Sequence, residues 1–161
     1  MPDTTQHQEI FSKILNTEIE QTQSLLKLLR QEYEHLKGTP SKTLEELVER
    51  KNQLLLQINQ SISKHNQLLL SQGYSADRKG TEDFIQQCPN KEQLDEHWSL
   101  FSSLLKACQK QNEIIGGAVK LNHHQVTQAL DILRGIAGSN KTYGPGGEAR
   151  PNTTSKSLGK A

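Results

Sequence analysis

The chain has 161 residues, of which 32% are hydrophobic and only 4% aromatic, and its formal net charge is +1. This length suits one domain, and the scarcity of rings argues against a thick enzyme interior and favours elongated helices that bury narrow stripes. The balanced charge excludes the strongly basic field of a dedicated nucleic-acid binder.

The start of the chain and its cysteines indicate a cytoplasmic protein. The first residues have neither the basic nor the apolar region of an export signal, and no aliphatic run is long enough for membrane insertion. Cys88 and Cys108 have no second cysteine or histidine at ligand spacing, which predicts two reduced thiols. No catalytic grouping has a supporting local signature, so we expect no enzyme, cofactor or metal.

The predicted fold is all-α, an elongated antiparallel hairpin with a long third helix in a coiled-coil-like three-helix bundle. The two helices of the hairpin are predicted at residues 5–37 and 42–72. Thr43 and Glu46 form a capping box at the start of the second helix, and Gly73 ends it. Apolar residues of the first helix recur at alternating steps of four and three, which is heptad spacing. The predicted seams are Leu15, Ile19, Thr22, Leu26, Leu29, Tyr33 and Leu36 in the first helix, and Leu44, Leu47, Leu54, Ile58, Ile62 and Leu69 in the second.

One string of five residues occurs twice in the second helix. Asn-Gln-Leu-Leu-Leu stands at 52–56 and again at 66–70, an offset of two heptads. Both copies therefore face the same way along the helix.

A short helical turn at about 81–87, capped by Thr81, precedes a long third helix at 90–137. Because this helix is longer than the hairpin, we expect its end to project and to leave an apolar stripe uncovered. Its heptad seam consists of Leu94, Trp98, Phe101, Leu105, Cys108, Asn112, Ile115, Val119, Asn122, Val126, Ala129, Leu133 and Ile136.

The third helix contains two features with open interpretations. Gly116-Gly117 weakens it, and the in-phase seam favours a continuous helix, with a kink as the alternative. Asn112 and Asn122 either fix register or partner choice in a coiled coil, or lie on a stripe exposed to solvent. Beyond the helical domain at 1–138, the composition of 139–161 predicts a flexible tail.

Histidine patterns near the end of the first helix suggest two kinds of chemistry. Glu32 and His35 form Glu-x-x-His, but a dimetal bundle needs a second copy, so we expect a solvated face here. His35-Leu36-Lys37-Gly38 is similar to the signature of histidine phosphotransfer domains, although it is one residue too short.

The C-terminal third resembles the FlgN family of flagellar export chaperones. Leu130-Asp-Ile-Leu133-Arg-Gly135 fits the family's Leu-x-x-Leu-x-Gly helix end. Tyr143-Gly-Pro-Gly-Gly147 follows, as the family's Tyr-Gly-Pro-Asp-Gly element does, with Gly146 in place of the aspartate.

The resemblance implies a cytosolic chaperone that binds C-terminal helical segments of unassembled hook-associated proteins of the hook–filament junction. It would keep them soluble and deliver them to the type III export gate, where Tyr143 would contact the cytoplasmic domain of the gate's large membrane protein. By the same resemblance, the C-terminal half of the third helix would hold the substrate, on the apolar stripe of Ile115, Val119, Val126, Leu130, Leu133 and Ile136.

Two alternatives come from other classes of protein. His35 could serve a phosphotransfer module, and the heptads could serve a homotypic structural coiled coil that self-associates.

Overall fold

The computed structural model describes residues 4–37, 42–116 and 120–137, with the backbone alone at 120–125 and 137. Within these ranges all regular secondary structure is α-helical, so the predicted all-α bundle is confirmed. The helices are α1 (Thr4–Leu36), α2 (Lys42–Ser71), α3 (Arg78–Gln86), α4 (Lys91–Gly116) and α5 (Lys120–Ala137).

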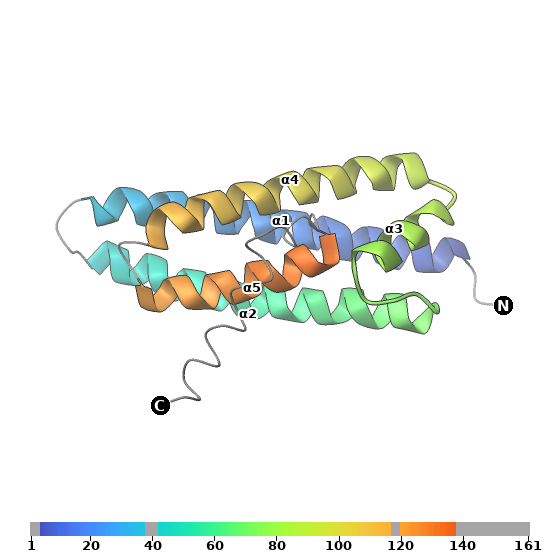
Figure 1. The fold of residues 1–161 in the computed structure, drawn as a ribbon, viewed down its shortest axis with the longest axis horizontal. Helices are drawn as coiled ribbons and strands as arrows, with labels where there is room; N and C mark the ends of the chain where they lie inside the picture. Colours follow the sequence, from blue (N-terminus) through green and yellow to red (C-terminus); the bar gives the residue numbers. More distant parts are fainter. Residues whose placement is uncertain (1–3, 38–41, 117–119, 138–161) are drawn as a thin grey trace, which may run out of the picture.

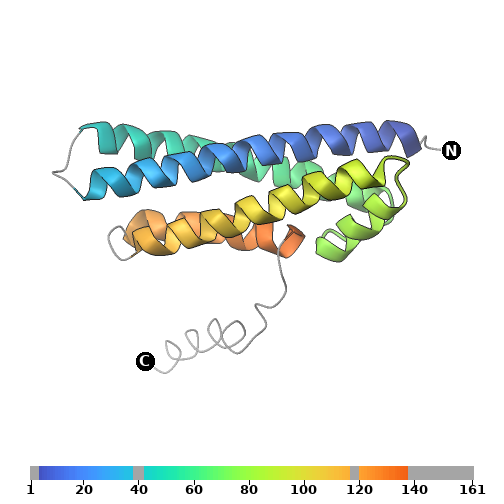
Figure 2. The same ribbon diagram turned by 90° about the horizontal axis from the view of Figure 1, so that it is seen from above.

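The helices form an elongated bundle with four columns (Figure 1). α1 and α2 are an antiparallel hairpin, and α4 runs beside α1 in the same direction as α1. α5 returns antiparallel to α4 and contacts both α4 and α2. The short α3 lies beyond the end of α5, so the two together make the fourth column opposite α1 (Figure 2).

The prediction of one helix over 90–137 is wrong, because this segment contains two helices that fold back on each other. α4 ends at Gly116 and α5 begins at Lys120. Each glycine in a helix costs about 1 kcal/mol relative to alanine, which makes this the weakest point of the segment. Folding back lets α5 bury its apolar stripe on the rest of the bundle, and this burial offsets the broken helix.

Glycine and aspartate shape the connection from α2 to α3. Gly73 has a φ of 84°, and Tyr74 N–H donates to the carbonyl of Leu69 over 2.9 Å, as in a Schellman cap. Asp77, rather than the predicted Thr81, caps α3, and its carboxylate accepts from Gly80 N–H over 2.7 Å. The N–H of Gly80 and the hydroxyl of Ser75 hold the pKa of Asp77 below its usual range.

The predicted seam of α4 is buried residue for residue, from Leu94 to Ile115. The core is aliphatic along most of the bundle, and apart from Tyr33 its aromatic residues come from the part of the bundle near α3. There the closest ring centroids are 5.0 to 5.8 Å apart, in the pairs Phe11–Phe84, Phe11–His65, Tyr74–Phe84 and Trp98–Phe101.

The predicted boundary at 138 and the tail at 139–161 lie outside the described residues. Among the helices that are described, none has a stretch both long and apolar enough to cross a membrane.

Candidate functional site

The structure brings together five of the seven site residues that the sequence predicts. Ile115 comes from the end of α4, and four residues share one face of α5. Val119 and Tyr143 lie outside the described residues. The four residues of α5 are Val126, Leu130, Leu133 and Ile136.

The expectation that this apolar stripe is uncovered is wrong. All five side chains belong to the hydrophobic core, and Leu130 is only 2% exposed. The reason is that α5 lies in the groove between α2, α3 and α4 instead of projecting beyond the hairpin. Helices α2, α3 and α4 of the same chain therefore cover the stripe that the sequence left without a partner.

The outer face of α5 remains open to solvent. Ile132 is 49% exposed, beside the exposed Gln128. Both side chains line a groove of about 390 Å³ between α5 and α2, where Leu56 is 65% exposed. The seam between α5 and α2 is thus less completely filled than the core beneath it.

A polar contact joins α4 to α5. The side-chain amide of Asn112 donates to the hydroxyl of Thr127 over 3.1 Å. Asn112 is buried, so solvent exposure is excluded for it, and its polar partner comes from its own chain. Asn122 lies where side chains are not described.

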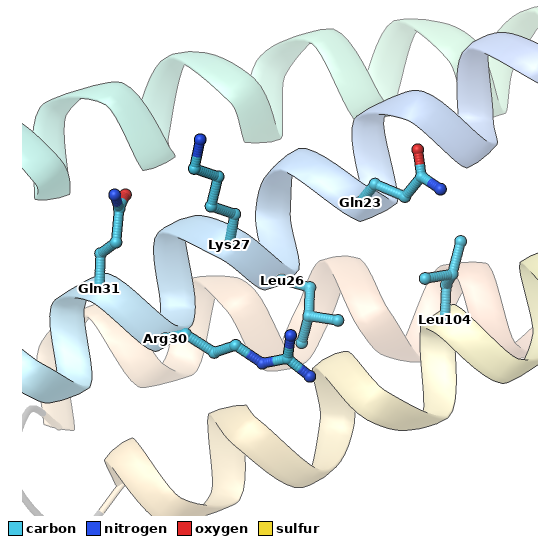
Figure 3. Close-up of a pocket in the computed structure, with 6 residues that line it drawn as sticks. All are labelled: Gln23, Leu26, Lys27, Arg30, Gln31 and Leu104. Carbon is cyan, nitrogen blue, oxygen red and sulfur yellow. The ribbon is translucent and has the colours of Figure 1, made fainter.

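A second groove of about 390 Å³ runs between α1 and α4. Figure 3 shows Leu26 and Arg30 reaching from α1 toward α4, and Leu104 reaching from α4. Lys27 adds a further positive charge to its lining. The groove is shallow and mixed in character, and it is separate from the α5 stripe.

Sequence reasoning missed a buried polar cluster in the hairpin. Nδ1 of His65 lies 2.9 and 3.1 Å from the two carboxylate oxygens of Glu18, and His65 Nε2 lies 3.0 Å from Oγ1 of Thr81. Glu18 on α1, His65 on α2 and Thr81 on α3 are all buried. Burial raises the pKa of Glu18, and the facing His65 acts in the opposite direction.

The hydrogen bonds of Thr81 assign the direction of its contact with His65. Thr81 donates its hydroxyl proton to the carbonyl of Asp77 over 3.0 Å, so its oxygen accepts from Nε2–H of His65. Nδ1 of His65 and the carboxylate of Glu18 face each other in the core as base and acid.

A second acid–base pair lies farther along the same hairpin. Nζ of Lys51 donates to Oε1 of Glu32 over 2.6 Å, and both side chains are at most 2% exposed. Oε2 of Glu32 has no hydrogen-bond partner among the described residues. The expected solvated face at Glu32 is therefore wrong, because α2 supplies a buried cation opposite it.

The sequence holds a signal for both pairs. Lys51 stands four residues from Leu47 and from Leu55, and His65 stands beside Ile62 and Leu69 on the same helical face. A charged or titratable residue at a core position requires a buried partner. The two acids and the two bases also share a spacing of two heptads, which suits one antiparallel alignment.

The alternative chemistries find little geometric support. Nδ1 of His35 is engaged by the carbonyl of Gln31 at 2.9 Å, near the end of α1. Over the described part of the chain, no three His, Cys, Asp or Glu side chains are grouped to hold a metal ion.

Comparison with known proteins relates the chain to flagellar proteins. A family model described as FlgN protein matches residues 1–151. The 1.48 Å crystal structure of a protein from Pseudomonas aeruginosa, provisionally named a flagella synthesis protein FlgN, matches with a TM-score of 0.71 at 24% identity. The match covers 83% of this chain and all of that one, and at this identity it shows the fold. A comparison with curated proteins finds no match.

Proposed function

Because the chain belongs to the FlgN family of flagellar export chaperones, we propose that it binds the C-terminal helical segments of unassembled hook–filament junction proteins. It holds them soluble in the cytosol and delivers them to the export gate. The observation that carries this proposal is the apolar stripe of α5, which is long enough to hold an amphipathic helix.

The stripe offers the spacing that helix capture needs. Val126, Leu130 and Leu133 stand at i, i+4 and i+7 on one face of α5. Such anchors let one helix lie along another, and complete burial of each side chain contributes about 1.5–3 kcal/mol. Ile115 at the end of α4 and Val119 after it extend the same heptad phase.

Capture by this stripe requires α5 to separate from α2, α3 and α4. The seam between α5 and α2 contains a groove of about 390 Å³, so α5 is incompletely packed against α2. The contact of α5 with α4 from Asn112 to Thr127 is polar, so it adds no apolar packing there. The unbroken seam spacing from Leu94 to Ile136 also suits an extended state in which α5 continues the line of α4.

The client competes with the chain's own helices for the α5 stripe, and this competition makes binding reversible. The free protein already buries the stripe, so the net affinity is the difference between contacts of α5 with the client and its contacts with α2, α3 and α4. If the open form is a small fraction of the population, the apparent Kd rises by the inverse of that fraction. A chaperone that must release its client at the gate benefits from this reduction.

The test compares two faces of α5 in the full chain. Leu130→Asp with Leu133→Asp removes the stripe, and Gln128→Asp with Ile132→Asp places the same charges on the exposed face. Titration calorimetry with C-terminal peptides of the junction proteins should show lost binding for the first variant and near-normal binding for the second. Normal affinity of the stripe variant, with helicity intact by circular dichroism, would refute the site.

Gate contact is assigned to Tyr143, on the strength of the family resemblance. Tyr143→Ala should weaken binding to the cytoplasmic domain of the gate's large membrane protein and leave affinity for the client peptides unchanged. Equal loss of both activities would contradict this division of roles.

A further inference from the structure

We propose that the two buried acid–base pairs, Glu18 with His65 and Glu32 with Lys51, together determine the register of the α1–α2 hairpin. They select one alignment of the two helices, while the aliphatic side chains around them supply the attraction. This role is independent of client binding.

Both pairs obey one antiparallel register. Glu18 and Glu32 are two heptads apart on α1, and Lys51 and His65 are two heptads apart on α2. Moving fourteen residues forward along α1 therefore corresponds to moving fourteen residues back along α2. The pairs repeat the same geometry at two levels of the hairpin, and each is buried.

The apolar faces specify alignment weakly. The buried apolar residues of α2 are only leucine and isoleucine, and those of α1 are leucine and isoleucine apart from Phe11. The strings at 52–56 and 66–70 make the surface of α2 repeat itself after two heptads. A hairpin that slips by whole heptads would still place leucine against leucine.

Slips of one heptad leave all of these charges unpaired. A slip of two heptads forms one acid–base contact, Glu18 with Lys51 or Glu32 with His65, and leaves the other two groups without their partners. A slip of one heptad in one direction places Glu18 against Ile58, and Lys51 against Leu25. An unpaired buried charge is strongly unfavourable, whereas replacing a matched pair with apolar residues is often neutral for stability. The pairs thus discriminate between alignments without adding much to the stability of the correct one.

The first test compares matched and crossed double variants of the full chain. Matched variants remove one whole pair, as in Glu32→Leu with Lys51→Met, or Glu18→Leu with His65→Met. Crossed variants, such as Glu18→Leu with Lys51→Met, remove the same types of residue but leave Glu32 and His65 each without its partner. We expect the crossed variants to lose on the order of 10 °C in Tm and the matched variants to lose little. Equal losses would overturn the proposal.

The second test measures register itself. Nitroxide labels at Lys13→Cys and Gln57→Cys, both on exposed positions, report the axial offset between α1 and α2 by pulsed electron paramagnetic resonance. A slip of one heptad changes this offset by about 10 Å. The parent chain should give one distance.

The decisive variant carries both matched replacements, so that Glu18, Glu32, Lys51 and His65 are all apolar. Thr81 keeps its bond to the carbonyl of Asp77 in this variant, so no new unpaired hydroxyl is created. We expect it to fold with an undiminished Tm and to show a second distance shifted by about 10 Å. A single parental distance would show that packing alone sets the register. Failure to fold would equally refute the proposal, because the pairs would then be needed for stability.

Discussion

Replacing Leu130 by alanine should loosen α5 without loosening the α1–α2 hairpin. Leu130 is 2% exposed, and truncation of leucine at such a site costs about 2–5 kcal/mol. If α5 opens as a separate unit, this whole free-energy cost weakens the packing of α5 against the rest of the bundle. Amide hydrogen exchange in α5 should then accelerate about 30-fold for a cost of about 2 kcal/mol, and more than roughly 1000-fold for a cost of about 5 kcal/mol.

Hydrogen exchange followed by mass spectrometry resolves α5 from α1 and α2. Ile132→Ala is the matched control, because this neighbour on the same helix is 49% exposed and should change stability by less than about 0.5 kcal/mol. Equal acceleration in α1, α2 and α5 of the Leu130→Ala chain would refute the reasoning. It would mean that α5 opens only when the whole bundle unfolds.

Three further outcomes follow from the described contacts. Burial raises the pKa of Cys88 to about 11 and that of Cys108, also buried, to about 12, so at pH 8 both thiols should react slowly with a disulfide reagent and rapidly in urea. Rapid reaction of Cys108 in the native chain would contradict its position in the core. Burial raises the pKa of Glu18 above its ordinary 4.5, so the folded chain binds more protons than the unfolded one above that pH, and this contribution to stability is lost as pH rises. Glu18→Gln should flatten the decline in urea stability as pH rises above 4.5, and an unchanged slope would exclude Glu18 as its source. A Cβ on Gly80 would lie 1.8 Å from the carbonyl oxygen of Ser75, so Gly80→Ala should cost about 1–3 kcal/mol in urea unfolding. Gly135→Ala, with nothing within 4 Å, should instead stabilise the chain by about 0.5–1 kcal/mol, and equal effects would contradict the close approach.

The heptad pattern predicted which residues are buried better than it predicted what covers them. Every predicted seam residue of α4 is buried, and so are Val126, Ala129, Leu133 and Ile136 of α5. Periodicity depends on the angle around a helix axis, which the sequence records directly. It does not record chain reversal, so the fold-back after Gly116 could not be read from the spacing.

The buried pairs were missed for a different reason. Glu32 and Lys51 are charged, and charged residues on helices usually face solvent. The apolar neighbours of Lys51 along α2 mark a core position, but its partner 2.6 Å away is found only when α1 and α2 are aligned. The contact depends on the alignment of two segments, which no single helix specifies.

The clustering of rings at one end of the bundle makes fluorescence a local probe. Trp98 is the chain's single tryptophan, and it lies near His65 and Phe101, at the end that α3 closes. Its emission therefore reports on that end, whereas circular dichroism averages over all helices. If the end near Gly116 opens first on heating, the dichroism signal will begin to fall before the tryptophan signal changes.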